Sequence, residues 1–294
     1  MILVCGGAGF IGSHLADRLL SLGHKVTIID DLSTGSLDNL DLFFKTKPYK
    51  NGVFYQGTVI DNLDTFDIEK IDYVFHLAAN TNVPLSVEDP LFDFKTLLNS
   101  VYLIDMCARL NIPLFYVSSS FIYGNAKRPT KETEPFQVSA PYGITKFTTE
   151  KYLEFYHEVY GLRYTVVRPA TVYGPRQVKG AMADYIRQLK AGKQAVIYGS
   201  KTRDYLYVSD LIDALILLMG KEGTYNVGTG KETSLESLYL DLAYLLNKKT
   251  DPIFEKERPG EVKHQSLNCS KLRKLGWKPK IKLIQGLELC LKEN

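Results

Sequence analysis

The sequence has few cysteines, and no pattern among them would bind a metal or build a disulfide framework. The four cysteines lie far apart in the 294 residues, at Cys5, Cys107, Cys269 and Cys290. Without a C-x-x-C pair or a histidine cluster, neither a zinc site nor the disulfide framework of a small secreted domain is indicated. We therefore expect reduced, mostly buried thiols and no metal.

Long apolar runs and long runs of one charge are also missing. The longest apolar run in the C-terminal half, 214–219, is far shorter than the roughly 20 residues that span a bilayer. Lys plus Arg total 36 against 33 for Asp plus Glu, and they are scattered, so no nucleic-acid-binding tail is indicated. The first expected strand begins at residue 2, which leaves no room for a signal or transit peptide. These features predict a cytoplasmic protein without a membrane or nucleic-acid partner.

The order of the expected elements predicts two lobes. The chain is long enough to bury a sizeable core. Up to residue 168, short apolar runs alternate with helical patterns about six times, which is the signature of a doubly wound parallel sheet. Beyond that point the alternation becomes irregular. We predict a Rossmann-type α/β domain over 1–168, to which 199–229 returns, and a smaller mixed substrate-binding lobe over 169–294.

A glycine-rich turn opens the chain. The apolar run 2–5 leads directly into it, and apolar residues at helical spacing follow over 10–22. Glycines permit a tight turn there and let the backbone approach a pyrophosphate, while the following helix points its free N–H groups at the phosphates. A structural turn is the plain alternative. The expected dinucleotide contacts are Gly6, Gly9, Phe10, Ile11 and Gly12.

Asp30 ends the second expected strand, 25–29, and indicates which dinucleotide binds. It lies at the spacing expected for a carboxylate that binds ribose hydroxyls. Such a group suits the 2′-hydroxyl of NAD, whereas the 2′-phosphate of NADP normally needs a basic residue, and none occurs from residue 30 to 42. We predict NAD, with further contacts from the loop residues Asp31, Ser33, Thr34 and Gly35.

Two more strand ends are expected beside the cofactor. Asp61 follows a short strand, 53–55, and would lie near an adenine or, equally well, cap a helix before Leu63. The run 73–79 is a strand with an exit turn whose Leu77, Ala78 and Ala79 would lie against the cofactor. His76 in that apolar run is interpreted as a hydrogen-bonded structural histidine.

Candidate catalytic groups follow the next expected strand, 114–117. Ser118, Ser119 and Ser120 emerge at the carboxyl edge of the sheet, where open α/β sheets bind ligands, although serines there also cap backbone groups. Tyr142 and Lys146 share one face of the helix expected over 141–160. A nearby ammonium and a positively charged nicotinamide would favour the phenolate, which makes Tyr142 a candidate base near neutral pH.

Taken together and in order, the motifs resemble the extended short-chain dehydrogenase/reductases that act on nucleotide sugars. The resemblance spans nearly the whole chain. It rests on the glycine turn 6–12, the segments 76–79 and 118–120, Tyr123-Gly124, Tyr142 with Lys146, and the segments 168–176, 203–208 and 258–261.

The resemblance implies a role for each matching residue. Tyr142 would be the base, Lys146 would lower its pKa and hold the nicotinamide ribose, and Ser119 would be the catalytic hydroxyl. Arg203 and Arg258 would bind the diphosphate, which suits the paired hydrogen bonds of a guanidinium. The remaining expected contacts are Arg168 for the cofactor and Ser120 and Thr171 for the substrate.

Departures from the family pattern narrow the expected activity. Dehydratases of this family carry Asp-Glu just after the catalytic hydroxyl and decarboxylases keep the Glu, but Ser120 and Phe121 stand here. Leu97 stands where epimerases of this family often have the Asn that opens an Asn-x-x-Gly-Thr pattern, and Thr171 replaces an Asn common near the substrate. Both changes leave the sugar open. We expect an NAD-dependent nucleotide-sugar epimerase that works through a transient 4-keto sugar, with UDP-glucose and UDP-galactose favoured.

Two alternatives stay open. A nucleotide 4-keto-sugar reductase commonly uses NADPH, and acidic Asp30 counts against it. A non-catalytic protein that senses NAD or a sugar nucleotide would not need the intact Ser119, Tyr142 and Lys146, and fold alone does not fix function. The resemblance further implies a homodimer formed through the helices expected over 91–110 and 141–160.

Overall fold

A seven-stranded parallel sheet forms the centre of the computed structural model, which describes residues 1–45, 52–62, 66 and 68–293. The strand order is β11-β6-β5-β4-β1-β2-β3. Both β2 and β4 pair with β1, so the chain winds outward in two directions from this strand. The strands are β1 Ile2–Cys5, β2 Val26–Asp30, β3 Gly52–Gln56, β4 Tyr73–His76, β5 Leu114–Val117, β6 Tyr164–Pro169 and β11 Gly223–Val227.

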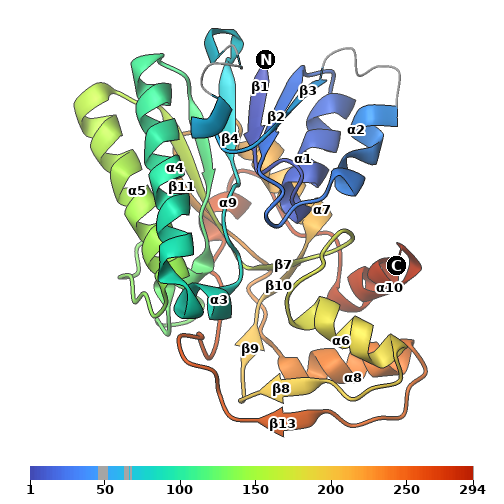
Figure 1. The fold of residues 1–294 in the computed structure, drawn as a ribbon. Coiled ribbons are helices and arrows are strands. Elements are labelled where there is room, and N and C mark those ends of the chain that lie inside the picture. The colour runs from blue at the N-terminus through green and yellow to red at the C-terminus, as the bar shows by residue number, and fades with distance from the viewer. Residues whose placement is uncertain (46–51, 63–65, 67, 294) are drawn as a thin grey trace.

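Helices cover both faces of this sheet (Figure 1). Helices α4 (Pro90–Arg109) and α5 (Pro141–Tyr160) pack side by side on one face, and α1 (Phe10–Ser21) and α7 (Val208–Leu218) lie together on the other. Successive side chains of a strand point to opposite faces, so Leu3 joins the apolar cluster under α4 and Val4 the cluster under α1. Because both faces are covered, all four residues of β1 are buried.

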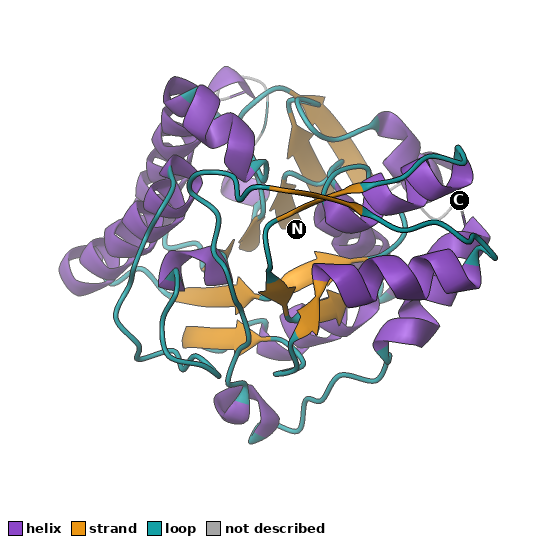
Figure 2. Ribbon diagram, turned by 90° about the horizontal axis from the view of Figure 1, so that it is seen from below, coloured by secondary structure: helices purple, strands orange, loops and turns teal. Residues whose placement is uncertain are grey.

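A smaller lobe lies beyond the carboxyl ends of the sheet strands and is seen from below in Figure 2. It contains three two-stranded sheets and the packed helices α6 and α8. Its elements are β7 Thr171–Tyr173, α6 Ala181–Lys190, β8 Val196–Tyr198, β9 Thr202–Arg203, β10 Tyr205–Tyr207, β12 Thr233–Ser234, α8 Leu235–Leu245, β13 Ile253–Glu255 and α10 Leu283–Glu293. Helix α9, Ser270–Arg273, packs on β11 of the large sheet instead.

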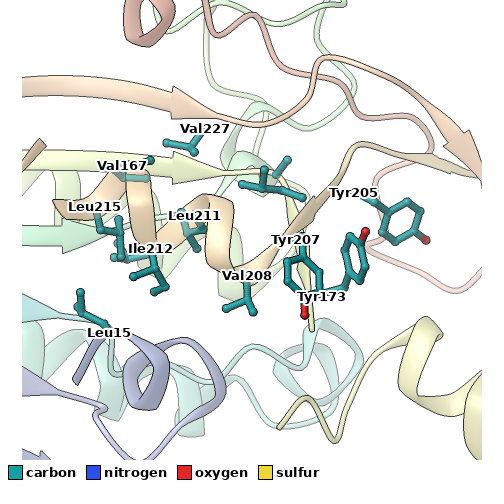
Figure 3. Close-up of a cluster of buried hydrophobic side chains, with 14 of the residues drawn as sticks. Leu15, Val167, Tyr173, Tyr205, Tyr207, Val208, Leu211, Ile212, Leu215 and Val227 are labelled. Carbon is teal, nitrogen blue, oxygen red and sulfur yellow. The ribbon is translucent and has the colours of Figure 1, made fainter. Parts of the chain in front are cut away.

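The two lobes share one continuous apolar core. Figure 3 shows Leu211 and Leu215 of α7 between the sheet residues Val167 and Val227 and Leu15 of α1. The same cluster continues through β7 and β10 of the smaller lobe and includes three buried tyrosines, Tyr173, Tyr205 and Tyr207. The chain therefore crosses between the lobes without an exposed linker at this point.

Shorter helical segments complete the fold. They are η1 Leu37–Leu40, α2 Asp41–Lys45, η3 Ile60–Asn62, η4 Ile68–Lys70, α3 Val83–Glu88 and η5 Ser120–Tyr123. No helix in the described part of the chain is long and apolar enough to cross a membrane.

The predicted doubly wound fold is confirmed, and several elements lie where the sequence places them. The strand over 114–117 and the helix over 141–160 match to the residue. Strand β11, which pairs in parallel with β6, was not identified from the sequence; it lies within the segment 199–229. Residues 46–51, and Leu63 at the start of the helix that Asp61 was expected to cap, lie outside the described residues. The division into lobes at residue 168 stays a prediction.

Candidate active site

A cleft of about 1300 Å³ opens at the carboxyl ends of the sheet strands, between the sheet and the smaller lobe. Its walls come from the β1–α1 turn, the exit turns of β4 and β5, the start of α5, and α6 with the segments around it. It includes the place where the chain winds in two directions from β1, which is where open α/β sheets bind their ligands.

The glycine turn forms one end of this cleft. Gly6 has a φ of 79°, and a Cβ there would lie 2.6 Å from the amide nitrogen of Ala78. A Cβ at Gly12 would overlap the carbonyl oxygen of Gly6, so only glycine lets helix and strand approach this closely. Helix α1 begins after Gly9 with no side-chain cap and no acidic residue in its first turn. Its first N–H groups therefore suit a dinucleotide phosphate.

Asp30 lies beside this turn and is held by the backbone. The amide of Ala8 donates to its Oδ2 at 2.9 Å and the amide of Leu32 to its Oδ1 at 2.8 Å. Burial raises the pKa of Asp30, and these two amides oppose the rise. Each carboxylate oxygen has a second lone pair for a ribose hydroxyl. The structure also places Asp31, Ser33 and Thr34 on the cleft.

Gly35 lies in the loop after β2, and its expected contact with the cofactor stays a prediction. A Cβ on Gly35 would lie 2.8 Å from the carbonyl carbon of Ala8. The amide of the next residue, Ser36, donates to the carbonyl oxygen of Ala8 at 3.1 Å. Gly35 therefore allows the loop after β2 to pack on the glycine turn.

Residues that follow β3 and β4 also line the cleft. Leu77, Ala78 and Ala79 line the cleft at the end of β4. Asp61 also lines it, but lies inside the short helix η3, where its carboxylate accepts hydrogen bonds from the amide and hydroxyl of Thr58 at 2.8 and 2.7 Å. These bonds lower the pKa of Asp61. The carboxylate thus stabilises a turn on the cleft wall, and the helix start that it was expected to cap lies outside the described residues.

His76 is buried and hydrogen-bonded, as expected for a structural histidine. Its Nε2 lies 2.8 Å from the hydroxyl of Ser100 on α4. Burial, with a smaller contribution from the ammonium of Lys146, lowers the pKa of His76 to about 3. The imidazole is therefore neutral under ordinary conditions.

Arg168 is the clearest correction among the expected cofactor contacts. Its Nε and Nη2 donate to the carboxylate of Glu150, and its Nη1 donates to the hydroxyl of Tyr123 at 2.7 Å. The side chain does not line the cleft. Burial disfavours its charge, but the bonds to Glu150 outweigh burial and raise the pKa of Arg168. Its guanidinium joins β6 to α5 behind the site.

Ser119, Tyr142 and Lys146 meet on the cleft wall. Ser119 follows β5, and its hydroxyl is hydrogen-bonded to the phenol of Tyr142. One turn further along α5, the ammonium of Lys146 donates to the carbonyl oxygen of Val117 at 2.8 Å. All three side chains line the cleft and are buried. A hydroxyl, a phenol and an ammonium therefore converge at the carboxyl end of β5.

The titration of this group differs from the sequence-based prediction. Burial raises the pKa of Tyr142 to about 12, although the Ser119 hydrogen bond opposes the rise. Burial also lowers the pKa of Lys146 to about 7, against the attraction of Glu150 and Asp93. The expected base thus needs both of the positive charges named in the sequence analysis, the ammonium of Lys146 and a bound nicotinamide, to favour the phenolate of Tyr142.

A glutamine that sequence reasoning missed connects the two expected sugar contacts. Gln265 donates from Nε2 to the hydroxyl of Ser120 at 2.7 Å and accepts at Oε1 from the hydroxyl of Thr171 at 3.0 Å. Ser120 in turn donates to the carbonyl oxygen of Pro169 at 2.7 Å. All three side chains line the cleft. The only sequence signal was the position of Gln265 shortly after the Arg-Pro-Gly-Glu motif.

A cluster of basic groups forms the far end of the cleft. Arg203 is buried, and its Nη1 donates to the carbonyl oxygens of Thr202 and Lys263 at 2.8 and 3.2 Å. Burial lowers its pKa, so a negatively charged partner would stabilise it. The guanidinium of Arg258 stacks on the ring of Tyr198, 3.5 Å from the centroid. Arg203 and Arg258 thus suit a diphosphate between them.

Lys201 joins this basic cluster and was also missed by sequence reasoning. It lies on the cleft and forms an ion pair with Glu261. Burial and the charge of Arg203 lower the pKa of Lys201 to about 8. A buried lysine with a nearby guanidinium again indicates that this end of the cleft favours an anion.

Comparison with known proteins agrees with this geometry. A model of the NAD-dependent epimerase/dehydratase family matches residues 2–228. The chain belongs to this family. It is accordingly an enzyme of the NAD-dependent epimerase class, and the prediction of NAD as cofactor is confirmed. The glycine turn, the uncapped start of α1 and the carboxylate of Asp30 fit that cofactor.

Three solved structures of this family resemble the chain over its whole length. A UDP-glucose 4-epimerase from Thermotoga maritima, solved with UDP-glucose, is 36% identical with a TM-score of 0.90 and covers 99% of this chain and 97% of its own. A UDP-N-acetylglucosamine 4-epimerase from Methanobrevibacter ruminantium, in complex with UDP-N-acetylmuramic acid, is 35% identical, with the same TM-score of 0.90 and coverage of 99% and 97%. A UDP-glucose 4-epimerase from Thermus thermophilus, in complex with NAD, is 31% identical with a TM-score of 0.90 and covers 99% and 98%.

The position of Asp30 predicts a preference between the two nicotinamide dinucleotides. The 2′-phosphate of NADP would lie beside this carboxylate, and the two negative charges would repel each other. NAD should therefore bind at least about tenfold more tightly than NADP, because a repulsion of about 1.4 kcal/mol corresponds to a tenfold difference in affinity. Isothermal titration calorimetry measures both affinities. Asp30→Asn should narrow the margin, whereas Asp38→Asn on η1 should leave it unchanged. Equal or tighter binding of NADP by the wild type would contradict the prediction.

Proposed function

We propose that this enzyme is a UDP-sugar 4-epimerase whose substrates are UDP-glucose and UDP-galactose. The observation that carries the proposal is the surroundings of the Tyr142 phenol. The ring of Phe121 lies edge-on to Tyr142, 6.0 Å between centroids, and the hydroxyl of Ser120 is bonded to Pro169 and Gln265. No carboxyl group stands at these two positions to eliminate water, so Tyr142 acts as the one proton acceptor and donor.

The residues of the chain support a reversible oxidation at C4 of the sugar. Tyr142 takes the proton of the sugar 4-hydroxyl as the O–H bond breaks. Ser119 is hydrogen-bonded to the phenol of Tyr142 and positions it for this transfer. A bound NAD would supply the reversible transfer of hydride at C4. Tyr142 would return the proton to the C4 oxygen after the sugar has turned its other face to the cofactor. Arg203 and Arg258 hold the diphosphate while the sugar turns.

Product analysis without added cofactor tests this function. The protein is incubated separately with UDP-galactose, UDP-N-acetylglucosamine and GDP-mannose. We expect UDP-galactose to be converted to UDP-glucose with no net change in the absorbance of reduced nicotinamide, because hydride leaves and returns within one turnover. If product forms only when stoichiometric NADPH is added, with one NADPH consumed per product, the protein is a keto-sugar reductase instead. Faster turnover of UDP-N-acetylglucosamine would overturn the choice of sugar while the epimerase class stands.

We also propose a homodimer formed through α4 and α5. Each helix exposes apolar side chains at helical spacing on its outer face, a pattern that marks an unpaired interface. The exposed fractions include 59% for Phe94 and 49% for Phe155. The set on α4 is Leu91, Phe94, Leu98 and Tyr102, and the set on α5 is Ile144, Tyr152, Phe155 and Val159.

The predicted cytoplasmic location stays a prediction.

Light scattering checks the dimer. The measured mass should be twice the 33.2 kDa of one chain, because self-complementary twofold contacts would cover both apolar faces. A double variant with Phe94→Glu and Phe155→Glu should be monomeric, since both new charges would be buried without partners. Tyr244→Glu, at a position on α8 that is 82% exposed, is the matched control and should remain dimeric. A monomeric wild type across a wide concentration range would contradict the proposal.

A further inference from the structure

The chain turns sharply between β7 and α6, at residues 174–177. The amide of Gln177 donates to the carbonyl oxygen of Gly174 at 3.4 Å. Between them, Pro175 is followed by Arg176, which has a φ of 66°. Proline followed by a residue with positive φ marks a type II turn, whose third position favours glycine or asparagine. Arg176 is therefore held in a conformation that its backbone disfavours, and an interaction of its side chain has to offset that cost.

The side chain of Arg176 forms an ion pair with α1. Its Nη2 donates to Oδ2 of Asp17 at 2.8 Å, and the two side chains are 22% and 18% exposed. Nη1 of Arg176 and Oδ1 of Asp17 are buried and have no hydrogen-bond partner among the described residues. Neither group has another ion-pair partner in the part of the chain that the structure describes. Each charge thus depends on the other.

A second contact joins the same turn to the same helix. The ring Nε2 of His14 lies 3.1 Å from the carbonyl oxygen of Pro175, which can only accept a hydrogen bond. Phe10, His14 and Asp17 follow one another at spacings of four and three residues, so they share one face of α1. Phe10, at the start of this face, lines the cleft. The turn 174–177 is therefore attached to the helix whose first N–H groups suit the cofactor phosphates.

The segment that begins in this turn forms a wall of the cleft. Residues 176–182 all line the cleft, and so do Asp184 and Tyr185 in the first half of α6. Asp17, in contrast, is not among the residues that line it. A change of Asp17 therefore acts on this wall through Arg176.

We propose that Arg176 is a positioning residue that holds the wall 176–182 on the cofactor-binding helix through its ion pair with Asp17. The proposal rests on the proposed function, because this wall is taken to hold the sugar nucleotide beside NAD. A small displacement of a binding wall weakens the placement of a substrate. The affinity for the sugar nucleotide thus depends on a carboxylate that lies outside the cleft lining.

Hydrogen exchange of the protein without nucleotide sugar tests the positioning itself and is followed by NMR. Asp17→Ala removes the carboxylate and places a good helix former on α1. The amides of Gln177 and Asp184 are hydrogen-bonded near the two ends of the wall and should exchange about threefold faster or more in this variant and in Arg176→Ala. Amides of α5 should exchange at the wild-type rate.

Steady-state kinetics measure the consequence for the substrate, with the sugar nucleotide that the product assay identifies. In Asp17→Ala and Arg176→Ala, KM should rise about threefold to tenfold while kcat changes little, because the catalytic groups belong to β5 and α5. Calorimetry should give an unchanged affinity for NAD, since the glycine turn and Asp30 keep their places.

Two variants separate the guanidinium from the backbone of the turn. Arg176→Gly suits a φ of 66° but lacks the guanidinium, so it should resemble Arg176→Ala in both exchange and KM. The charge swap Asp17→Arg with Arg176→Asp rebuilds the pair in reverse, and aspartate tolerates a positive φ, so part of the loss should be recovered. Arg109→Ala is the matched control, because it removes an arginine that pairs with Asp105 on α4, and it should behave as the wild type.

Wild-type exchange and KM in Asp17→Ala, beside a raised KM in Arg176→Ala, would show that Arg176 contacts the ligand itself and would overturn the proposal. Wild-type behaviour of Arg176→Gly would also overturn it, since the backbone of the turn would then be what matters. The exchange measurement needs neither substrate nor turnover, so its result stands if the product assay fails. Unchanged exchange in both alanine variants would in turn contradict the positioning and leave the epimerase assignment standing.

Discussion

Tyr142→Phe should reduce turnover of the UDP-sugar by about a hundredfold to ten-thousandfold, the usual effect of losing a general base. The substitution keeps the ring that packs against Phe121 and removes only the oxygen that bonds Ser119. NAD should still bind, because its phosphates belong at the glycine turn. Steady-state rates and calorimetric titration with NAD measure the two effects separately.

Tyr239→Phe is the matched control for this result. Tyr239 is fully buried on α8, and its hydroxyl has no hydrogen-bond partner among the described residues. Removing that oxygen leaves no partner unsatisfied, so rate and stability should both be near normal. If Tyr142→Phe turns over substrate as fast as Tyr239→Phe, Tyr142 is not the base, and the proposed proton transfer is wrong.

The fold was predictable where local signals mark the limits of an element. Pro113 precedes β5, and Gly161, with a φ of 72°, ends α5, so the bounds of both elements follow from residues that cannot continue a helix or that favour a left-handed turn. The glycine turn and Asp30 were equally readable, because a fixed spacing links them to one ligand. Strand β11 was missed because its five residues gain stability from pairing with β6, more than 50 residues earlier.

The sequence predicts most of the residues that form the site, but it does not predict their pKa values. Tyr142 and Lys146 share a helix face, which spacing alone reveals. Their pKa values depend on burial by β5 and α4 and on Asp93 and Glu150, which no short motif contains. Gln265 was missed for the same reason, since its partners Ser120 and Thr171 lie about 90 residues or more before it in the chain. Arg168 was misplaced because a motif identifies a residue without showing which way its side chain points.

The burial of Arg168 has a large consequence for stability. Its guanidinium and the carboxylate of Glu150 are 4% and 3% exposed, and Nη1 also bonds Tyr123, whose hydroxyl donates to Asn226 at 2.8 Å. Arg168→Met leaves the Glu150 charge buried and unpaired. Breaking such a pair costs about 3–5 kcal/mol, so the free energy of unfolding should fall by that amount. Urea denaturation followed by circular dichroism measures the change.

Two further variants separate the lost ion pair from a general effect of removing an arginine. Arg187→Met removes a guanidinium that is 63% exposed and pairs with Asp184 on the surface, so it should cost at most about 1 kcal/mol. The double variant Arg168→Met with Glu150→Leu replaces both charges by apolar groups and should be more stable than Arg168→Met alone, because no unpaired charge remains buried. If Arg168→Met is as stable as Arg187→Met, or if the double variant is the least stable of the three, the ion pair is not what joins β6 to α5.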